Sequence, residues 1–481
     1  MTKVVALSNA ATYGTGRVAA TSVSVNNYVT VDNLLPNRGG LTNASGLPPA
    51  GASMPAYEKD DILIGNIRPY LKKIWSADRN GGCSNDVLVI RAKTGYSPKF
   101  LYYALLRDEF FSHMMNGKKG TKMPRGDKGQ IMRYPIPDFP RPVQDRIAAV
   151  LSALDAKITL NQRINAELEA MAKLLYDYWF VQFDFPMSAA QAKRLGKAQL
   201  EGRPYKSSGG PMVYNPELKR EVPEGWEVTE LRKYLKSNRG VSYTSSDIGE
   251  VGLPMINLNS FNPNSTYKPE GLKLYSGDFN PSKALAPFDL VMCNTQQTAL
   301  DPAKDIIGKS LLVPDIFDKE ALSSHHVTTI GVNKPNLKYL LNCLFNTEYF
   351  HKYISGYCAG TNILGLNFQG VLSFRTAIPD DALLESFGTL VLSIERRKSV
   401  SFKENQELTA LRDWLLPLLM NGQVRVSASS SAGALEEATP SALLDVTPAV
   451  AKVPPSRSAT AENGLAMAAE GAVKYGKKGK E

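Results

Sequence analysis

Residues 165–171 read Asn-Ala-Glu-Leu-Glu-Ala-Met, and residues 405–411 read Asn-Gln-Glu-Leu-Thr-Ala-Leu. Similar matches recur in the same order along the chain, at offsets between 228 and 242 residues. The further pairs are residues 61–66 with 289–294, 99–101 with 338–340, 109–111 with 348–350, and 136–138 with 378–380. The sequence therefore predicts two copies of one unit, each a globular part followed by a long helix. A pseudo-twofold molecule of this kind suits a ligand with two halves, and DNA is the leading candidate.

A long helix is predicted at the end of each copy. No Pro or Gly interrupts residues 143–185, where apolar residues such as Ile147 and Leu151 recur every three or four positions. The second copy shows the same spacing, for example at Leu408 and Leu411. A narrow apolar stripe on so long a helix is typical of a coiled-coil strand. Two such helices in one chain can pair with each other.

Composition favours a polyanionic partner. The chain has 481 residues and a formal net charge of +10, with a pI of about 9.1. An excess of basic side chains attracts nucleic acid by electrostatic steering and counterion release. The four cysteines are far apart and are expected to be reduced. With neither a signal peptide nor 18 consecutive apolar residues, the chain is expected in the cytoplasm and not in a membrane.

Three short motifs suggest an enzyme but lack the residues that the chemistry requires. Residues 14–19 fit G-x-G-x-x-A, yet β-branched and Asn residues follow where the helix should begin. Gly308-Lys309-Ser310 resembles the end of a phosphate loop, but Ala303 replaces the required glycine. His325-His326 has no third ligand nearby in the sequence. We therefore expect no catalytic residue, metal site or cofactor in this chain.

The expected DNA contacts lie in two loops of each copy. Residues 117–133 carry six basic residues against one acid, with glycines between them, which suits contacts to phosphates and guanine edges. Residues 356–375 offer Asn and Gln instead, which pair with adenine. The other loop follows the strand that ends at Asn66 or Asn294. The candidates are Arg68, Tyr70, Lys72, Lys73, Lys118, Lys119, Lys122, Arg125 and Lys128 in the first copy, and Gln296, Gln297, Asn362, Asn367 and Gln369 in the second. A solvated loop without a ligand is the alternative reading of residues 117–133.

Several stretches resemble the specificity (S) subunits of type I restriction–modification systems. They are residues 144–158, 161–162, 167–172 and 178–185 around the first long helix, Val-Pro-Glu-Gly-Trp at 222–226, and residues 404–408 and 411–417 in the second. The resemblance covers about residues 57–424 and involves both helices at once. Residues 1–30 lack an opening like that at 223–226, so the start of the first domain departs from the pattern.

The resemblance implies an α+β fold in which two pseudo-repeated α/β target-recognition domains are joined by two long helices forming an antiparallel coiled coil. Each domain would read one half of an asymmetric, bipartite site on double-stranded DNA. Two modification subunits, which use S-adenosylmethionine to methylate adenine, and two restriction subunits, which use ATP and Mg, would be the partners. The S subunit itself is not an enzyme. Leu174, Tyr178, Leu415 and Leu418 are candidate docking residues, although pairing within the coil is an equally good use for them.

The expected divisions are a first target-recognition domain at 1–140, a central helix at 141–185, a linker at 186–221, a second target-recognition domain at 222–380, a distal helix at 381–424 and a disordered tail at 425–481. Two other classes of function are kept in view. A stand-alone DNA-binding regulator could share this architecture, and a duplicated enzyme with an unrecognised site would methylate or cleave DNA alone. A methylation-only system would leave no distinguishing mark in this chain.

Overall fold

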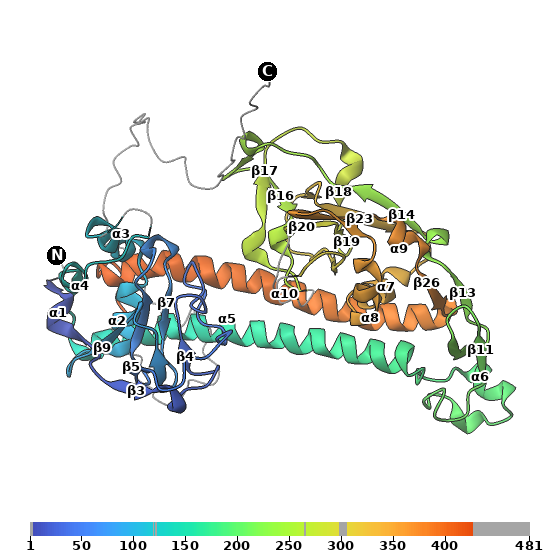
Figure 1. The fold of residues 1–481 in the computed structure, drawn as a ribbon, viewed down its shortest axis with the longest axis horizontal. Coiled ribbons are helices and arrows are strands. Elements are labelled where there is room, and N and C mark those ends of the chain that lie inside the picture. Colours follow the sequence, from blue (N-terminus) through green and yellow to red (C-terminus); the bar gives the residue numbers. More distant parts are fainter. Residues whose placement is uncertain (1–2, 119, 121–122, 264–265, 298–304, 427–481) are drawn as a thin grey trace, which may run out of the picture.

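The structure is a computed structural model that describes residues 3–118, 120, 123–263, 266–297 and 305–426. The tail expected at 425–481 therefore lies almost entirely outside the described residues. The fold is mixed helix and sheet, with two globular units seated on a pair of long helices (Figure 1).

The first unit is built on a four-stranded sheet with the order β2-β9-β6-β7. Ile62, Ile64 and Ile90 of this sheet are buried together with Phe100 and Phe110 of the covering helices. The elements of the unit are β1 (Val4–Ala6), α1 (Leu7–Ala10), β2 (Ala11–Tyr13), β3 (Arg17–Ala19), β4 (Tyr28–Val29), β5 (Ser53–Tyr57), β6 (Ile62–Gly65), β7 (Ile74–Ser76), β8 (Gly81–Cys83), β9 (Val87–Ala92), α2 (Pro98–Leu105), α3 (Asp108–Asn116), α4 (Lys128–Met132) and β10 (Pro135–Pro137).

The second unit repeats this plan with the order β14-β23-β19-β21. Beside this sheet, the first unit has a four-stranded sheet, β3-β5-β8-β4, and the second unit has a five-stranded sheet, β15-β17-β16-β22-β18, and a three-stranded sheet, β20-β25-β24. Its strands are β13 (Glu227–Glu230), β14 (Leu235–Arg239), β15 (Ile248–Gly249), β16 (Leu253–Ile256), β17 (Lys273–Tyr275), β18 (Ala284–Leu285), β19 (Leu290–Cys293), β20 (Thr295–Gln297), β21 (Ser310–Leu312), β22 (Ala321–Ser323), β23 (Val327–Val332), β24 (Cys358–Ala359), β25 (Ile363–Leu366) and β26 (Arg375–Ile378). Its helices are α7 (Leu337–Phe345), α8 (Glu348–Ser355) and α9 (Gln369–Ser373).

The repeat seen in the sequence extends to individual hydrogen bonds. A carboxylate oxygen of Asp61 accepts from the backbone N–H three residues earlier at 2.8 Å, and Asp289 does the same at 2.8 Å. Each aspartate stands directly before a buried strand, β6 or β19. The pairing of β1 with β10 likewise matches that of β13 with β26. The first unit thus begins at the equivalent of β13, even though its opening sequence differs from residues 223–226.

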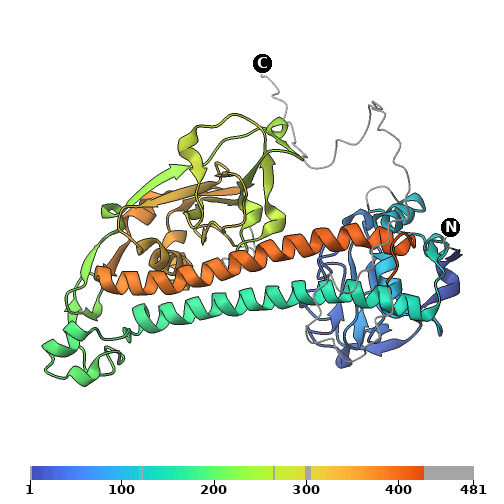
Figure 2. The same ribbon diagram turned by 180° about the vertical axis from the view of Figure 1, so that it is seen from behind.

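Helices α5 (Arg141–Tyr176) and α10 (Asp381–Met420) run side by side in opposite directions (Figures 1 and 2). Each helix starts in the core of its own unit and ends in the core of the other. Leu151 of α5 is buried with Leu415 of α10 in the first unit's core. At the other end, Phe180 packs against Phe387, with ring centroids 4.7 Å apart. Both cores therefore fix the register of the helix pair.

The middle of the helix pair is polar rather than apolar. Asn161 is buried, and its Nδ2 donates to Asn405 Oδ1 at 3.0 Å and to Glu404 Oε2 at 2.8 Å. Lys157 forms an ion pair with Glu404 at 3.3 Å. A buried asparagine pair specifies one register of a coiled coil at some cost in stability. The fully buried apolar residues of the helix pair are thus concentrated toward its two ends.

Residues 186–221, expected as a linker, are folded. They contain α6 (Ala189–Arg194), β11 (Met212–Asn215) and the start of β12 (Arg220–Pro223), which pairs with β11. Phe185 stacks on Tyr205 with centroids 4.6 Å apart and on Trp226 with centroids 5.5 Å apart. This aromatic cluster gives the segment a core of its own and attaches it to the second unit, which a Ser/Gly-rich composition does not reveal.

Candidate nucleic-acid interface

The two predicted DNA-contacting loops of the first unit form one surface. Ile67 and Arg125 form a β-bridge, and the backbone N–H of Arg68 donates to the carbonyl of Pro124 at 2.8 Å. The backbone N–H of Gly126 donates to the carbonyl of Asn66 at 3.4 Å. These bonds hold residues 66–68 and 124–126 together at the end of β6. Sequence separation alone did not indicate that the loops touch.

Most of the described basic candidates on this surface face solvent. Arg68, Tyr70, Lys118, Arg125 and Lys128 are exposed, whereas Lys119 and Lys122 lie outside the described residues. Arg68 has a left-handed backbone with φ of 52°. A non-glycine residue in this region is held there by its surroundings and marks candidate functional positions.

Lys72 and Lys73 have roles inside the unit that the sequence analysis missed. Lys72 Nζ forms an ion pair with Asp108 at 2.8 Å, and burial, with the nearby guanidinium of Arg38, lowers the pKa of Lys72. Lys73 Nζ donates to the carbonyl of Val31, and burial lowers the pKa of Lys73 as well. Both side chains are half-buried, and their contacts with Asp108 and Val31 attach the loop to the rest of the unit. They are weaker candidates for DNA contact than their neighbours.

Tyr13, at the end of β2, also contacts this surface, and no motif in the sequence predicted this. Its hydroxyl donates to the carbonyl of Lys128 at 3.0 Å, and the Lys128 ammonium lies 5.5 Å from the ring centroid. Burial raises the pKa of Tyr13, so the phenol stays protonated and able to donate. The ring thereby fixes the end of the basic loop. Only the fold, which places the end of β2 beside α4, reveals this contact.

The second unit places its predicted loops together in the same way. Thr295 of β20 pairs with Gly365 of β25, and the backbone N–H of Leu366 donates to the carbonyl of Asn294 at 2.8 Å. The exposed polar tips are Asn362, Asn367 and Gln369. The equivalent surface therefore offers amides where the first unit offers cations.

Gln296 is a correction to the predicted contacts. Its side chain is 5% exposed, and its Oε1 accepts from the backbone N–H groups of Ile306 at 2.7 Å and Ile307 at 2.9 Å. The amide closes residues 305–307 onto β20 instead of facing solvent. The side chain of Gln297 lies outside the described residues.

The two adjacent histidines, His325 and His326, lie against each other. The rings of His325 and His326 lie 3.8 Å apart between centroids. Burial and the neighbouring His325 lower the pKa of His326 to about 4, so it is neutral near pH 7. Within the described part of the chain, no group of three or more His, Cys, Asp or Glu side chains has a suitable arrangement for a metal ion.

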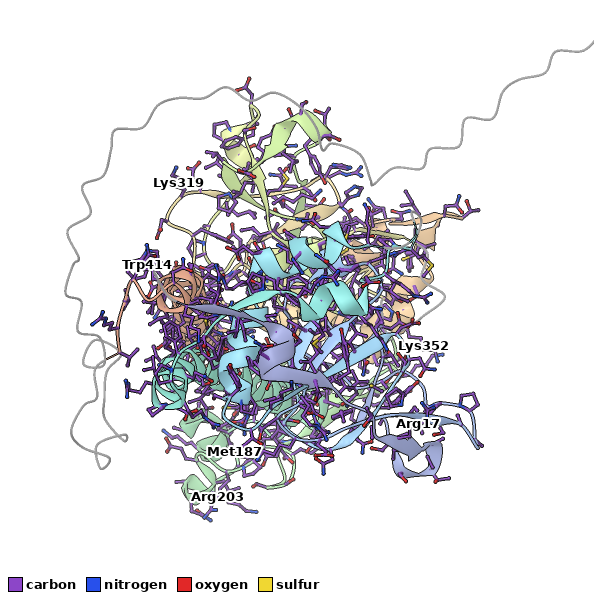
Figure 3. The ribbon with its side chains drawn as sticks, turned by 90° about the vertical axis from the view of Figure 1, so that its left-hand side faces the viewer. Arg17, Met187, Arg203, Lys319, Lys352 and Trp414 are labelled. Atoms are coloured by element: carbon purple, nitrogen blue, oxygen red, sulfur yellow. The ribbon has the colours of Figure 1, made fainter. Side chains whose placement is uncertain are left out.

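Exposed apolar side chains mark the two ends of the helix pair. Leu174 is 69% exposed and Tyr178 is 38% exposed at the end of α5. Trp414, at the position of α10 equivalent to Leu174, is 59% exposed and is labelled at the side of α10 in Figure 3. Leu415 is a correction, because it is buried in the first unit's core, and Leu418 is half-buried. The sequence analysis named Leu415 as the docking residue, but the exposed side chain is that of the preceding residue, Trp414.

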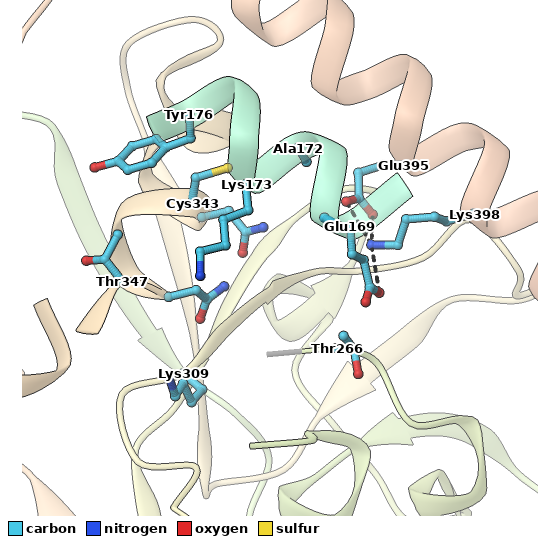
Figure 4. A pocket seen from close by; sticks show the side chains of 13 residues that line it. Glu169, Ala172, Lys173, Tyr176, Thr266, Lys309, Cys343, Thr347, Glu395 and Lys398 are labelled. Carbon is cyan, nitrogen blue, oxygen red and sulfur yellow. Dashed lines mark hydrogen bonds and ion pairs between the residues drawn. The ribbon is translucent and has the colours of Figure 1, made fainter. Parts of the chain in front are cut away.

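A cavity of about 400 Å³ lies between α5, α10 and the second unit (Figure 4). The ammonium of Lys398 forms ion pairs with Glu395 at 3.0 Å and Glu169 at 3.3 Å across its rim. Burial disfavours the charged ammonium, but the two carboxylates outweigh this and raise the pKa of Lys398. These groups bind one another and join the two helices. We therefore assign this cavity a structural role.

No helix in the described ranges is both long enough and apolar enough to cross a membrane.

Comparison with known proteins gives a consistent set of relatives. A family model described as the type I restriction modification DNA specificity domain matches residues 21–170. The chain is 24% identical over 438 residues to the HindI specificity subunit of Haemophilus influenzae, covering 80% of this chain and 90% of that protein. It is 25% identical over 338 residues to the MjaIX specificity subunit of Methanocaldococcus jannaschii, covering 69% of this chain and 71% of that protein. A solved type I S subunit from M. genitalium aligns with a TM-score of 0.49 at 13% identity, covering 87% of this chain and 96% of that one.

Proposed function

We propose that this chain is a specificity subunit of the type I restriction–modification family, and that it selects the DNA site on which a modification or restriction complex acts. Each globular unit reads one half of an asymmetric, bipartite site on double-stranded DNA. The chain supplies recognition, and its partners supply methylation and ATP-dependent cleavage. We keep the divisions of the sequence analysis for this proposal, except that residues 186–221 belong with the second unit.

The observation that carries the proposal is that the two units share one arrangement of contact loops but expose different side chains on them. Residues 66–68 and 124–126 meet at the end of β6, and residues 294–297 and 363–366 meet at the end of β19. The bridge of Ile67 with Arg125 is equivalent to that of Thr295 with Gly365, while the exposed polar candidates are mostly cationic in the first unit and amides in the second. Arginine and lysine suit phosphates and guanine, and asparagine and glutamine suit adenine. Two such readers recognise two different half-sites.

The helix pair is suited to fixing the distance between the half-sites. Helix α5 alone has 36 residues, which span about 54 Å. Half-sites on one face of DNA lie about 34 Å apart for each helical turn. Because both ends of the helix pair are built into the cores of the two units, the units cannot slide relative to one another. A flexible linker would not hold this distance.

We propose that the exposed apolar residues at the two ends of the helix pair receive two modification subunits. Leu174 and Tyr178 form one patch, and Trp414 and Leu418 form its pseudo-twofold mate. Exposed apolar groups rimmed by polar ones mark protein interfaces. S-adenosylmethionine would be bound by these partners, and ATP and Mg by two restriction subunits joining the same complex.

Replacing Leu174 or Trp414 by aspartate is expected to remove one modification subunit each, because a buried carboxylate would face an apolar partner. Loss of an interface anchor typically weakens binding at least about 30-fold. The measurement is the mass of the purified complex, and Arg163→Ala, an exposed change in the middle of α5, is the matched control. Full complexes from both aspartate variants would place the docking surface elsewhere.

The experiment that tests the function is expression of this chain with a modification subunit encoded beside its gene, followed by single-molecule sequencing of the host genome. One split motif, methylated on adenine and with a fixed gap, is the expected result. A chain that binds DNA while no methylation appears in an intact complex would favour the stand-alone regulator. Methylation or cleavage by the isolated chain would favour the duplicated enzyme.

A further inference from the structure

One exposed arginine of the first unit is held in place on both sides. The backbone of Arg125 forms a β-bridge with Ile67, and its Nη2 donates to a carboxylate oxygen of Asp86 at 2.9 Å. Asp86 directly precedes β9, and its carbonyl accepts from the backbone N–H of Asn66 at 2.8 Å. The Arg125 side chain is nevertheless 55% exposed. It is thus oriented by the protein and still accessible from solvent.

The second unit lacks this pair at the equivalent place. There the backbone N–H of Asn294 donates to the carbonyl of His326 at 3.0 Å, so His326 occupies the position of Asp86. The β-bridge of Thr295 with Gly365 likewise makes Gly365 the counterpart of Arg125. Glycine has no side chain, and His326 is neutral near pH 7 because burial and His325 lower its pKa. The two units therefore differ at this point by the presence of a fixed guanidinium.

We propose that Arg125, positioned by Asp86, reads a guanine in the half-site of the first unit, and that the second unit reads no guanine from the equivalent position. A guanidinium donates two parallel N–H groups to guanine O6 and N7 in the major groove, and this pairing specifies guanine over the other bases. Among the described residues, the Arg125 side chain donates only to Asp86, through Nη2, so its other donors are available for the base. An ion pair that fixes the guanidinium before binding reduces the entropy lost on contact.

The neighbours of Arg125 suit the complementary task of holding the backbone of the DNA. Arg68, Lys118 and Lys128 are exposed on the same pair of loops. Cationic side chains whose orientation is not fixed by the protein contact phosphates without reading sequence. The positioned arginine differs from them because its geometry is fixed. The inference deepens the proposed function and depends on it.

The test uses the full chain in complex with its modification subunits and a library of randomised DNA duplexes, with sequencing of the bound fraction at two salt concentrations. Arg125→Lys keeps the charge but loses the fork, so guanine preference at one position should fall by about 10- to 100-fold. Asp86→Asn should lower the same preference by a smaller factor, and Asp86→Glu should restore most of it. The other half-site and the salt dependence of binding should stay unchanged in each variant.

Matched controls come from the opposite edge of the same sheet, where β6 begins and β7 ends. Arg79 pairs with Asp78 at 2.9 Å beyond the end of β7, away from the reading loops. Arg79→Lys and Asp78→Asn change the same chemistry and should leave both half-sites intact. An unchanged second half-site in the Arg125 and Asp86 variants shows that these chains are folded. If Arg125→Lys fails this check, Asp86→Asn alone decides the inference.

The outcomes separate this inference from the proposed function. If the wild-type complex selects no split motif, the proposed function itself is overturned. A split motif whose guanine preferences all survive Arg125→Lys, or survive Asp86→Asn where that variant decides, overturns only the inference. Uniform weakening across all sequences, with a smaller salt dependence, would make Arg125 a phosphate contact and overturn it too.

Discussion

A chain lengthened by one heptad in each long helix, after Asn161 in α5 and after Lys403 in α10, is expected to recognise half-sites about three base pairs farther apart. Seven residues add about 10 Å to a helix, and DNA advances about 3.4 Å per base pair. The methylated motif of the variant complex, read by genome sequencing, gives the new gap directly. An unchanged gap would show that the helix pair does not set the spacing.

The two insertion points are chosen because they face each other. Asn161 contacts Asn405 at 3.0 Å, so an insert after Asn161 lies at the level of an insert after Lys403. On the far side, Asn165 and Ser401 occupy the positions equivalent to Asn405 and Asn161 under the pseudo-twofold relation, and both are buried. A matched insertion keeps the residues on each side of it at the same level, and a seven-residue repeat preserves the facing surfaces of the coil.

An insertion in α5 alone is the control for this experiment. It shifts Asn165 and every later residue of α5 by two turns relative to α10, while both ends remain fixed in the two cores. We expect loss of the folded complex, because ion pairs and core contacts at one end must break. A functional single-helix insertion would mean that the helices do not act as one rigid pair.

The repeat made the scaffold predictable from the sequence, because matched residues at nearly constant offsets must occupy matched places. Asp61 and Asp289 indicate this most clearly, since both occupy the same turn before an equivalent strand. The spacing of Ile147, Leu151 and Leu154 likewise indicated a long helix, and the structure has α5 there. The spacing of apolar residues and the internal repeat are properties of the sequence itself, so they can be recognised without a structure.

The use of individual polar side chains was not predictable in the same way. Gln296 and Asn362 are both amides in expected contact loops, yet one is buried and the other exposed. The difference arises because residues 305–307 close over β20, a contact between segments whose proximity the sequence does not encode locally. Lys73 was assigned to DNA for the same reason, although Val31 accepts its hydrogen bond. Hydrogen-bond partners depend on tertiary placement, which composition cannot supply.

The contrast between Leu415 and Trp414 shows the limit of helical periodicity. A shift of one residue turns a side chain by about 100° around the helix, which is enough to exchange core for solvent. The apolar stripe of α10 was therefore recognised, but the residue that faces outward was misassigned by one position. Only the packing of Leu415 against the first unit's core settles which neighbour is free.

Replacing Lys398 by alanine is expected to destabilise the junction of α5, α10 and the second unit by about 3–5 kcal/mol. The Lys398 side chain is 12% exposed, and its ammonium forms ion pairs with Glu395 and Glu169. Without it, two mostly buried carboxylates face each other with no cation between them. The measurements are the urea midpoint of the chain at pH 7 and hydrogen exchange along α5 and α10. Arg397→Ala, an exposed neighbour on α10, is the control and should change stability by less than about 0.5 kcal/mol.

The effect of pH distinguishes this mechanism from a loss of packing. Burial already raises the pKa of Glu169 in the native chain, and removal of Lys398 should raise it further. A carboxyl group whose pKa is higher in the folded state binds more protons there than when unfolded, so its effect on stability becomes more favourable as pH falls. The deficit of Lys398→Ala should therefore shrink between pH 7 and pH 5. The triple variant Glu169→Gln, Glu395→Gln, Lys398→Met removes all three charges and should regain most of the lost stability. A deficit that is independent of pH and persists in the triple variant would assign the loss to the alkyl chain of Lys398 instead of its charge.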